Sequence, residues 1–197
     1  MKHKGHKELI LRNEPNSYRI LSHFEMVYRP GERDLAKSFL KALGLDVTES
    51  GKYLVGFVGT PASGNGYENS ITASEVTPEH WEFEQALEKE MQRPDLAGLS
   101  ASYLRELKSK PQNRPHFGMA YSSLDSWNAS VEGFQEALDR HPELKGRAEI
   151  ASKFVPGSPG AQTDFLHHAF IHTDIVGFAC LPLGVVIELQ HYARNPT

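Results

Sequence analysis

The chain has 197 residues, of which 39% are hydrophobic and 23% are charged, a balance typical of a globular protein with a buried core. The formal net charge of −4 and the lack of a Lys/Arg run beyond the first seven residues argue against nucleic-acid binding. No apolar stretch approaches the roughly 20 residues of a membrane span, and the basic start lacks the apolar segment of a secretory signal. We therefore expect a cytoplasmic protein that binds neither membranes nor nucleic acids.

The first half of the chain predicts a strand, a helix and three further strands. Residues 23–28 alternate between two sets of side chains, as a strand does, and Pro30-Gly31 ends that strand. Apolar side chains at helical spacing predict a helix over 32–43, with Gly44 as its stop. The remaining predictions are strands at 45–48, 53–58 and 71–76, with a glycine-rich loop over 60–69.

A segment with helical periodicity follows. Apolar residues predict helices within 81–91 and 99–107, and Pro94 separates the two. We interpret residues 78–114 as a helical linker that packs on the outside of the molecule. The second half then repeats the order of the first half, with a helix at 130–138 and strands at 116–122, 149–155, 165–173 and 185–190.

A short motif occurs in both halves. The pattern His23-Phe24-x-Met26-x-Tyr28 returns 93 residues later as His116-Phe117-x-Met119-x-Tyr121. A repeat of this length indicates two copies of one supersecondary unit. We therefore expect units over 18–77 and 115–192, joined by the linker, with His23 and His116 at equivalent places.

Two imidazoles and one carboxylate suggest a metal site. On the predicted strands, His23 and His116 share a face with small or polar residues, whereas the opposite faces carry Phe, Met and Tyr. Glu188 lies within the apolar run 185–189, where a carboxylate is costly unless it is paired, exposed or bound to a metal. This ligand set suits Fe²⁺, with Mn²⁺ or Zn²⁺ as alternatives.

Two consecutive β-α-β-β-β units that each open with a His-led strand resemble the vicinal oxygen chelate superfamily, which includes glyoxalase I, type I extradiol dioxygenases and bleomycin-binding proteins. The resemblance rests on the segments 23–27, 35–44, 116–120 and 186–190. It implies an α+β fold in which the two modules form a curled, open mixed sheet with a cup. It also implies metal ligands on the first and last strands, here His23, His116 and Glu188, as in the ring-cleaving dioxygenases. A fourth ligand at Glu75 would instead resemble the glyoxalases and epimerases.

The resemblance leaves three functions open. The first is a metal-dependent dioxygenase that acts on a small oxygen-rich substrate. The second is a lyase or isomerase in which Glu75 or Glu188 moves a proton next to a carbonyl. The third is a metal-free protein that binds a small molecule without chemistry. His172, on the predicted strand 165–173, is the candidate acid/base residue, and exposed strand edges predict a homodimer.

Overall fold

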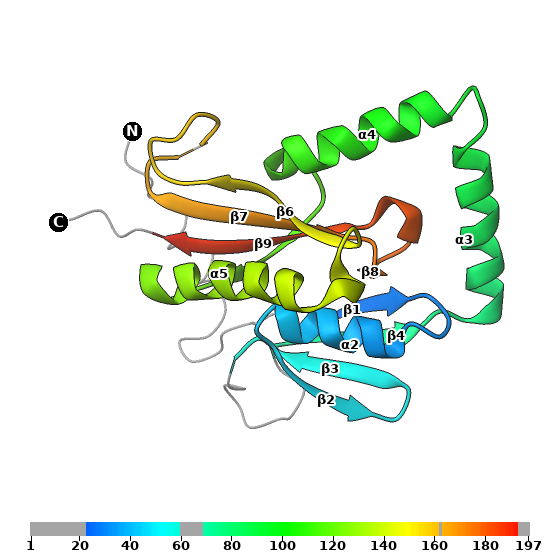
Figure 1. Ribbon diagram of the computed structural model, residues 1–197, viewed down its shortest axis with the longest axis horizontal. Coiled ribbons are helices and arrows are strands. Elements are labelled where there is room, and N and C mark those ends of the chain that lie inside the picture. The colour runs from blue at the N-terminus through cyan, green and yellow to red at the C-terminus, as the bar shows by residue number, and fades with distance from the viewer. Residues whose placement is uncertain (1–22, 60–68, 162, 193–197) are drawn as a thin grey trace, which may run out of the picture.

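The computed structural model describes residues 23–59, 69–161 and 163–192, and it has an α+β fold with two open mixed sheets (Figure 1). This confirms the predicted fold class. Residues 18–22 of the first predicted unit and residues 60–68 of the predicted loop lie outside the described residues. No helix among the described residues is both long and apolar enough to cross a bilayer.

The first sheet has five strands in the order β2-β3-β4-β1-β8. Its strands are β1 (His23–Tyr28), β2 (Asp46–Ser50), β3 (Tyr53–Phe57), β4 (Ser70–Glu75) and β8 (Val176–Gly177). Strands β1 and β4 are parallel, and the other neighbours are antiparallel. The alternation seen in the sequence is therefore real: Met26 and Tyr28 of β1 are buried, whereas His23 and Glu25 are exposed on the other face.

The second sheet has four strands in the order β5-β9-β7-β6. Its strands are β5 (Phe117–Ala120), β6 (Ala148–Phe154), β7 (Leu166–Thr173) and β9 (Val185–Tyr192). In both halves the first strand is parallel to the last, and the two middle strands follow as an antiparallel pair. The two halves thus share one strand order, although the predicted unit limits at 18–77 and 115–192 stay a prediction.

The main core lies between the sheets and two helices, α2 (Arg33–Ala42) and α5 (Leu124–Arg140), which run side by side in Figure 1. Phe39 of α2 and Phe134 of α5 meet edge to face, with ring centres 6.2 Å apart. Helix α5 begins six residues before its predicted start because Ser123 and Ser126 form a capping box there. The predicted range 130–138 contains most of the buried residues of α5, and Trp127 in its first turns is buried in the core as well.

Strand β8 was not predicted, because two residues are too few for a periodic pattern. It follows β7 of the second half in sequence but pairs with β1 of the first sheet, through Val27 with Gly177 and Tyr28 with Val176. Nearby, the guanidinium of Arg147 bonds both carboxylate oxygens of Glu32 at 3.1 and 3.0 Å and Asp174 at 2.6 Å. One backbone pairing and one charge network therefore join the two halves.

The linker forms two helices, α3 (Pro78–Met91) and α4 (Ala97–Ser109), which run in different directions in Figure 1. The side chains of α4 are mostly exposed or half-buried, and this helix contacts the second sheet through one buried side chain. Leu107 of α4 is buried against Phe170 of β7 and Val186 of β9. Helix α3 is fixed by the buried carboxylate of Glu84, which accepts hydrogen bonds from the backbone N–H groups of Cys180 and Leu181, both at 2.9 Å.

Candidate functional site

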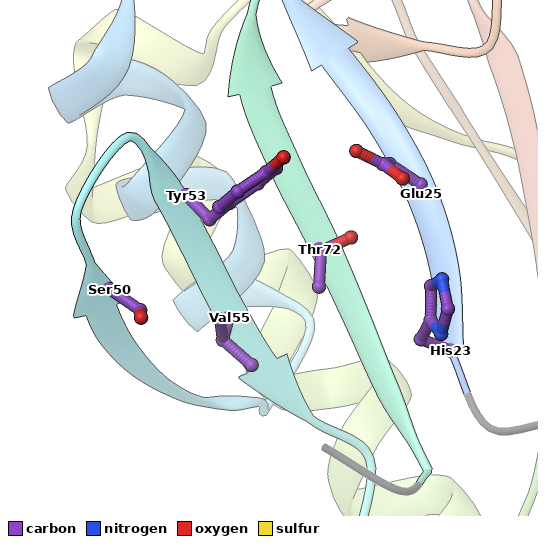
Figure 2. A pocket seen from close by; sticks show the side chains of 6 residues that line it. All are labelled: His23, Glu25, Ser50, Tyr53, Val55 and Thr72. Atoms are coloured by element: carbon purple, nitrogen blue, oxygen red, sulfur yellow. The ribbon is translucent and has the colours of Figure 1, made fainter.

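A cavity of about 350 Å³ lies on the exposed face of the first sheet, beside the predicted ligand His23. Its lining side chains come from four neighbouring strands (Figure 2): His23 and Glu25 of β1, Ser50 of β2, Tyr53 and Val55 of β3, and Thr72 of β4. Strand register explains this grouping, because Glu25 is opposite Thr72 and Thr72 is opposite Val55, and directly paired residues share a face. The cavity thus combines an apolar floor with polar groups at its sides.

Glu25 and Tyr53 define the polar part of this cavity. Figure 2 shows the Glu25 carboxylate and the Tyr53 hydroxyl directed toward one another across β4. The ammonium of Lys52 lies 5.0 Å from the centre of the Tyr53 ring, so the ring already accommodates a cation on one face. A carboxylate next to an aromatic ring favours a bound cation or hydrogen-bond donor over an anion.

The predicted ligands His116 and Glu188 are brought together in the second sheet. Glu188 of β9 is 6% exposed and lies opposite Gly118 of β5. A Cβ at position 118 would lie only 3.1 Å from Glu188 Oε2, so the glycine leaves room for the carboxylate. His116 immediately precedes β5, and its Nε2 lies 3.3 Å from the same oxygen.

A second histidine, His168 of β7, also contacts this carboxylate. Its Nδ1 is hydrogen-bonded to Glu188 Oε1. The ring stacks on Phe170 with the centres 5.6 Å apart, and its Nε2 is buried without a hydrogen-bond partner. Both oxygens of Glu188 therefore contact imidazoles. These contacts offset the free-energy cost of burying a carboxylate in this strand.

The predicted set His23, His116 and Glu188 does not form one metal centre in the described structure. The cavity beside His23 is lined by neither His116 nor Glu188. Among the described residues, no three His, Cys, Asp or Glu side chains are placed so that they could hold one ion. The pair His116 and Glu188 fits two adjacent ligand positions, but the described residues do not supply a third, so we derive no reaction step through a metal.

Glu75 does not join His23 either. The register pairs His23 with Ser70 at one end of β4 and Tyr28 with Glu75 at the other end. Five residues of strand separate Ser70 from Glu75, a distance of about 16 Å. The Glu75 carboxylate accepts a hydrogen bond of 2.9 Å from the backbone N–H of Gly31. The structure thus places Glu75 at the turn after β1, away from His23, and its role as ligand or base stays a prediction.

His172 shares a face of the second sheet with Glu188 but lies opposite Val186, two residues before Glu188 in β9. Its Nε2 is 3.0 Å from the backbone carbonyl of Leu183. Burial is the main reason that the pKa of His172 falls below its usual range, although the hydrogen bond to Leu183 opposes this shift. His172 therefore lines a separate cavity, beside Lys108 and Arg147, and does not contact the His116–Glu188 pair.

Sequence reasoning missed the contact of His168 with Glu188 and the contribution of Tyr53 to the cavity. His168 belongs to a histidine-rich strand, 166–173, and that composition was the available signal. The choice between His168 and His172 depends on the pairing of β7 with β9, which places Phe170 opposite Glu188. The alternation of side chains along one strand does not show which residues of the next strand lie opposite them.

No protein-family model and no curated protein matches this chain. Among solved structures, it is similar to a hypothetical protein from S. aureus, with 13% identity, 88% of this chain and 94% of that chain covered, and a TM-score of 0.42. A protein from Pseudomonas aeruginosa has 11% identity, coverage of 88% and 98%, and a TM-score of 0.42. A glyoxalase/bleomycin resistance protein/dioxygenase family enzyme from Burkholderia phytofirmans PsJN has 10% identity, coverage of 88% and 99%, and a TM-score of 0.40. Likenesses of this size carry no argument about what the chain binds.

Proposed function

We propose that this protein binds a small organic molecule in the cavity on the exposed face of the first sheet. The observation that supports this function is the lining itself: one carboxylate, one imidazole and one phenol surround an apolar floor in a space of about 350 Å³. Ligand sites of this kind are concave, partly apolar and equipped with a few convergent polar groups. The proposal corresponds to the metal-free binding protein among the functions left open by the sequence.

Glu25 sets the expected ligand chemistry. Its carboxylate faces the cavity next to the Tyr53 ring, so a ligand with an ammonium or another donor group and a flat apolar part matches both. Benzylamine and benzoate are suitable probes because they share a ring and differ in charge. We expect benzylamine to shift the backbone amide resonances of β1, β3 and β4, and benzoate to leave them unchanged.

Two variants make this test specific. Glu25→Gln removes the charge at nearly constant shape and should abolish the preference for benzylamine. Glu82→Gln changes an exposed carboxylate of α3, outside the cavity lining, and serves as the matched control. The proposal fails if neither probe shifts the three strands, or if benzylamine shifts them equally in the Glu25→Gln variant.

A divalent-metal site at His116 and Glu188 is the second candidate, and one specific observation favours it. His116 Nδ1 lies 2.7 Å from the Arg114 carbonyl, which only accepts, so Nδ1 carries the proton. In the neutral ring, the Nε2 lone pair then faces the Glu188 carboxylate at 3.3 Å, and a bound cation, like a proton on Nε2, would stabilise this contact. A carbonyl behind a ligating imidazole is also the usual arrangement around protein-bound metals.

Elemental analysis of protein purified without chelator tests the second candidate. If it is correct, iron, manganese or zinc near one per chain should be lost in His116→Ala and retained in His141→Ala, a matched control at an exposed histidine. No bound metal after reconstitution, or equal metal content in both variants, would refute it. Glu25→Gln should not change the metal content, so the two candidates fail independently.

The homodimer predicted from the sequence also remains a proposal. Strand β2 at one edge of the first sheet and β6 at one edge of the second are the open edges that support it. Light scattering coupled to size-exclusion chromatography distinguishes a dimer from a 22.0 kDa monomer. A single monomeric species at high protein concentration would contradict the proposal.

A further inference from the structure

A second cavity, of about 360 Å³, lies between the C-terminal half of α4 and one end of the second sheet. Lys108 and Leu104 of α4 line one side, and Glu149 at the start of β6 and His172 of β7 line the other. None of these residues lines the cavity beside His23. The second cavity is thus a separate space, formed where the linker crosses the sheet.

His172 offers a hydrogen-bond acceptor to this cavity. The residue is 6% exposed, and its Nε2 must donate to the Leu183 carbonyl because that oxygen only accepts. In the neutral ring, Nδ1 is then an acceptor. Among the described residues, none donates a hydrogen bond to Nδ1. His172 Nδ1 is not one of the fully buried polar atoms that lack a partner, so it stays open to the cavity, and a ligand group that donates a hydrogen bond can take the place of water there.

The charges around the cavity balance. Lys108 Nζ is 2.5 Å from Glu149 Oε1, and Arg147 Nε is 2.6 Å from Asp174 Oδ1. Because each cation already has an anionic partner, an anionic or cationic ligand would bring an uncompensated charge. Lys108 still has donor capacity beyond its bond to Glu149, since an ammonium group carries three N–H bonds.

We propose that this cavity binds a small, uncharged polyhydroxylated molecule of about the size of a hexose. One hydroxyl donates to His172 Nδ1, and an adjacent hydroxyl oxygen accepts from Lys108 Nζ. Leu104 and Pro182 provide apolar surface for the C–H face of the ligand. A hydroxyl group both donates and accepts hydrogen bonds, so neighbouring hydroxyls match the acceptor of His172 and the donor of Lys108.

Saturation-transfer NMR and calorimetry with myo-inositol, on the full chain, test this proposal. Wild type should bind, and Lys108→Met should raise Kd about tenfold, since a hydrogen bond to a charged group is removed. Lys110→Met is the matched control, because this lysine is exposed, two residues further along, and outside the lining. Its Kd should stay within about twofold of wild type.

The imidazole resonances of His172 give a direct readout without a mutation, because myo-inositol should shift Nδ1 more than Nε2. Glucuronate, a charged probe of similar size, should bind more weakly. The proposal is overturned if myo-inositol does not bind, if only glucuronate binds, or if Lys108→Met and Lys110→Met behave alike. Glu25→Gln should leave the binding of myo-inositol unchanged. A failure of this proposal can therefore be distinguished from a failure of the proposed function.

Discussion

Replacing Leu107 with alanine should release α4 from the second sheet. Leu107 is 5% exposed and is the buried residue of α4, packed against Phe170 and Val186. The change removes about three methyl or methylene groups, worth roughly 0.8 kcal/mol each, and leaves a cavity with a further cost. We expect a loss of about 3 kcal/mol, which corresponds to an opening equilibrium shifted on the order of 100-fold.

Amide hydrogen exchange of residues 97–109 measures this opening. Leu99→Ala is the matched control, because Leu99 is on the same helix and 67% exposed, so its removal should change exchange little. If α4 exchanged equally fast in wild type, Leu107→Ala and Leu99→Ala, the helix would not be held by this contact.

Three further predictions concern the loop before β9, the helix α5 and His172 of β7. Gly184→Ala should destabilise the fold severely, by more than about 3 kcal/mol in urea unfolding, because its φ is +69° and a Cβ would lie 2.2 Å from the Thr173 carbonyl. Gly133→Ala, in α5 with no atom within 4 Å of the added Cβ, should instead stabilise by about 0.5–1 kcal/mol in the same assay. Burial lowers the pKa of His172, so its stability contribution is present above the ordinary value of 6.5 and is lost as pH falls below it. The urea midpoint should therefore drop as the pH is lowered from 7.5 to 5.5, and it should drop less in His172→Gln. An equal pH dependence of the midpoint in wild type and variant would contradict this prediction.

The local elements followed from the sequence because each pattern reports on its own segment. Alternation over His23–Tyr28 predicted β1, and the apolar spacing over 32–43 predicted α2. The strand pattern also placed His23 on the face away from Met26, which the structure bears out. The patterns did not give every boundary: the start of α5 is set by the Ser123 cap, and β8 is only two residues long.

The site was predicted in part, and the reason is the register between strands. Glu188 was identified as anomalous because a carboxylate in an apolar strand is costly without a partner, and that argument needs only the sequence. The identity of the partners needs tertiary structure: β9 lies between β5 and β7, which brings both His116 and His168 to the carboxylate. His23, equivalent to His116 by repeat, opens instead onto a cavity of its own sheet.

The sequence by itself determined the α+β class, the repeated order of strands and helices and the odd position of Glu188, because these depend on periodicity and on the cost of burying charge within one segment. Only the tertiary structure decided which side chains meet. The odd or even position of a residue along a strand decides which face of the sheet carries its side chain. Which side chains then meet depends on the sheet twist, on the strand register and on the elements that cover the face. Here α4 packs on the face that carries Glu188, and it also forms one wall of the cavity beside His172.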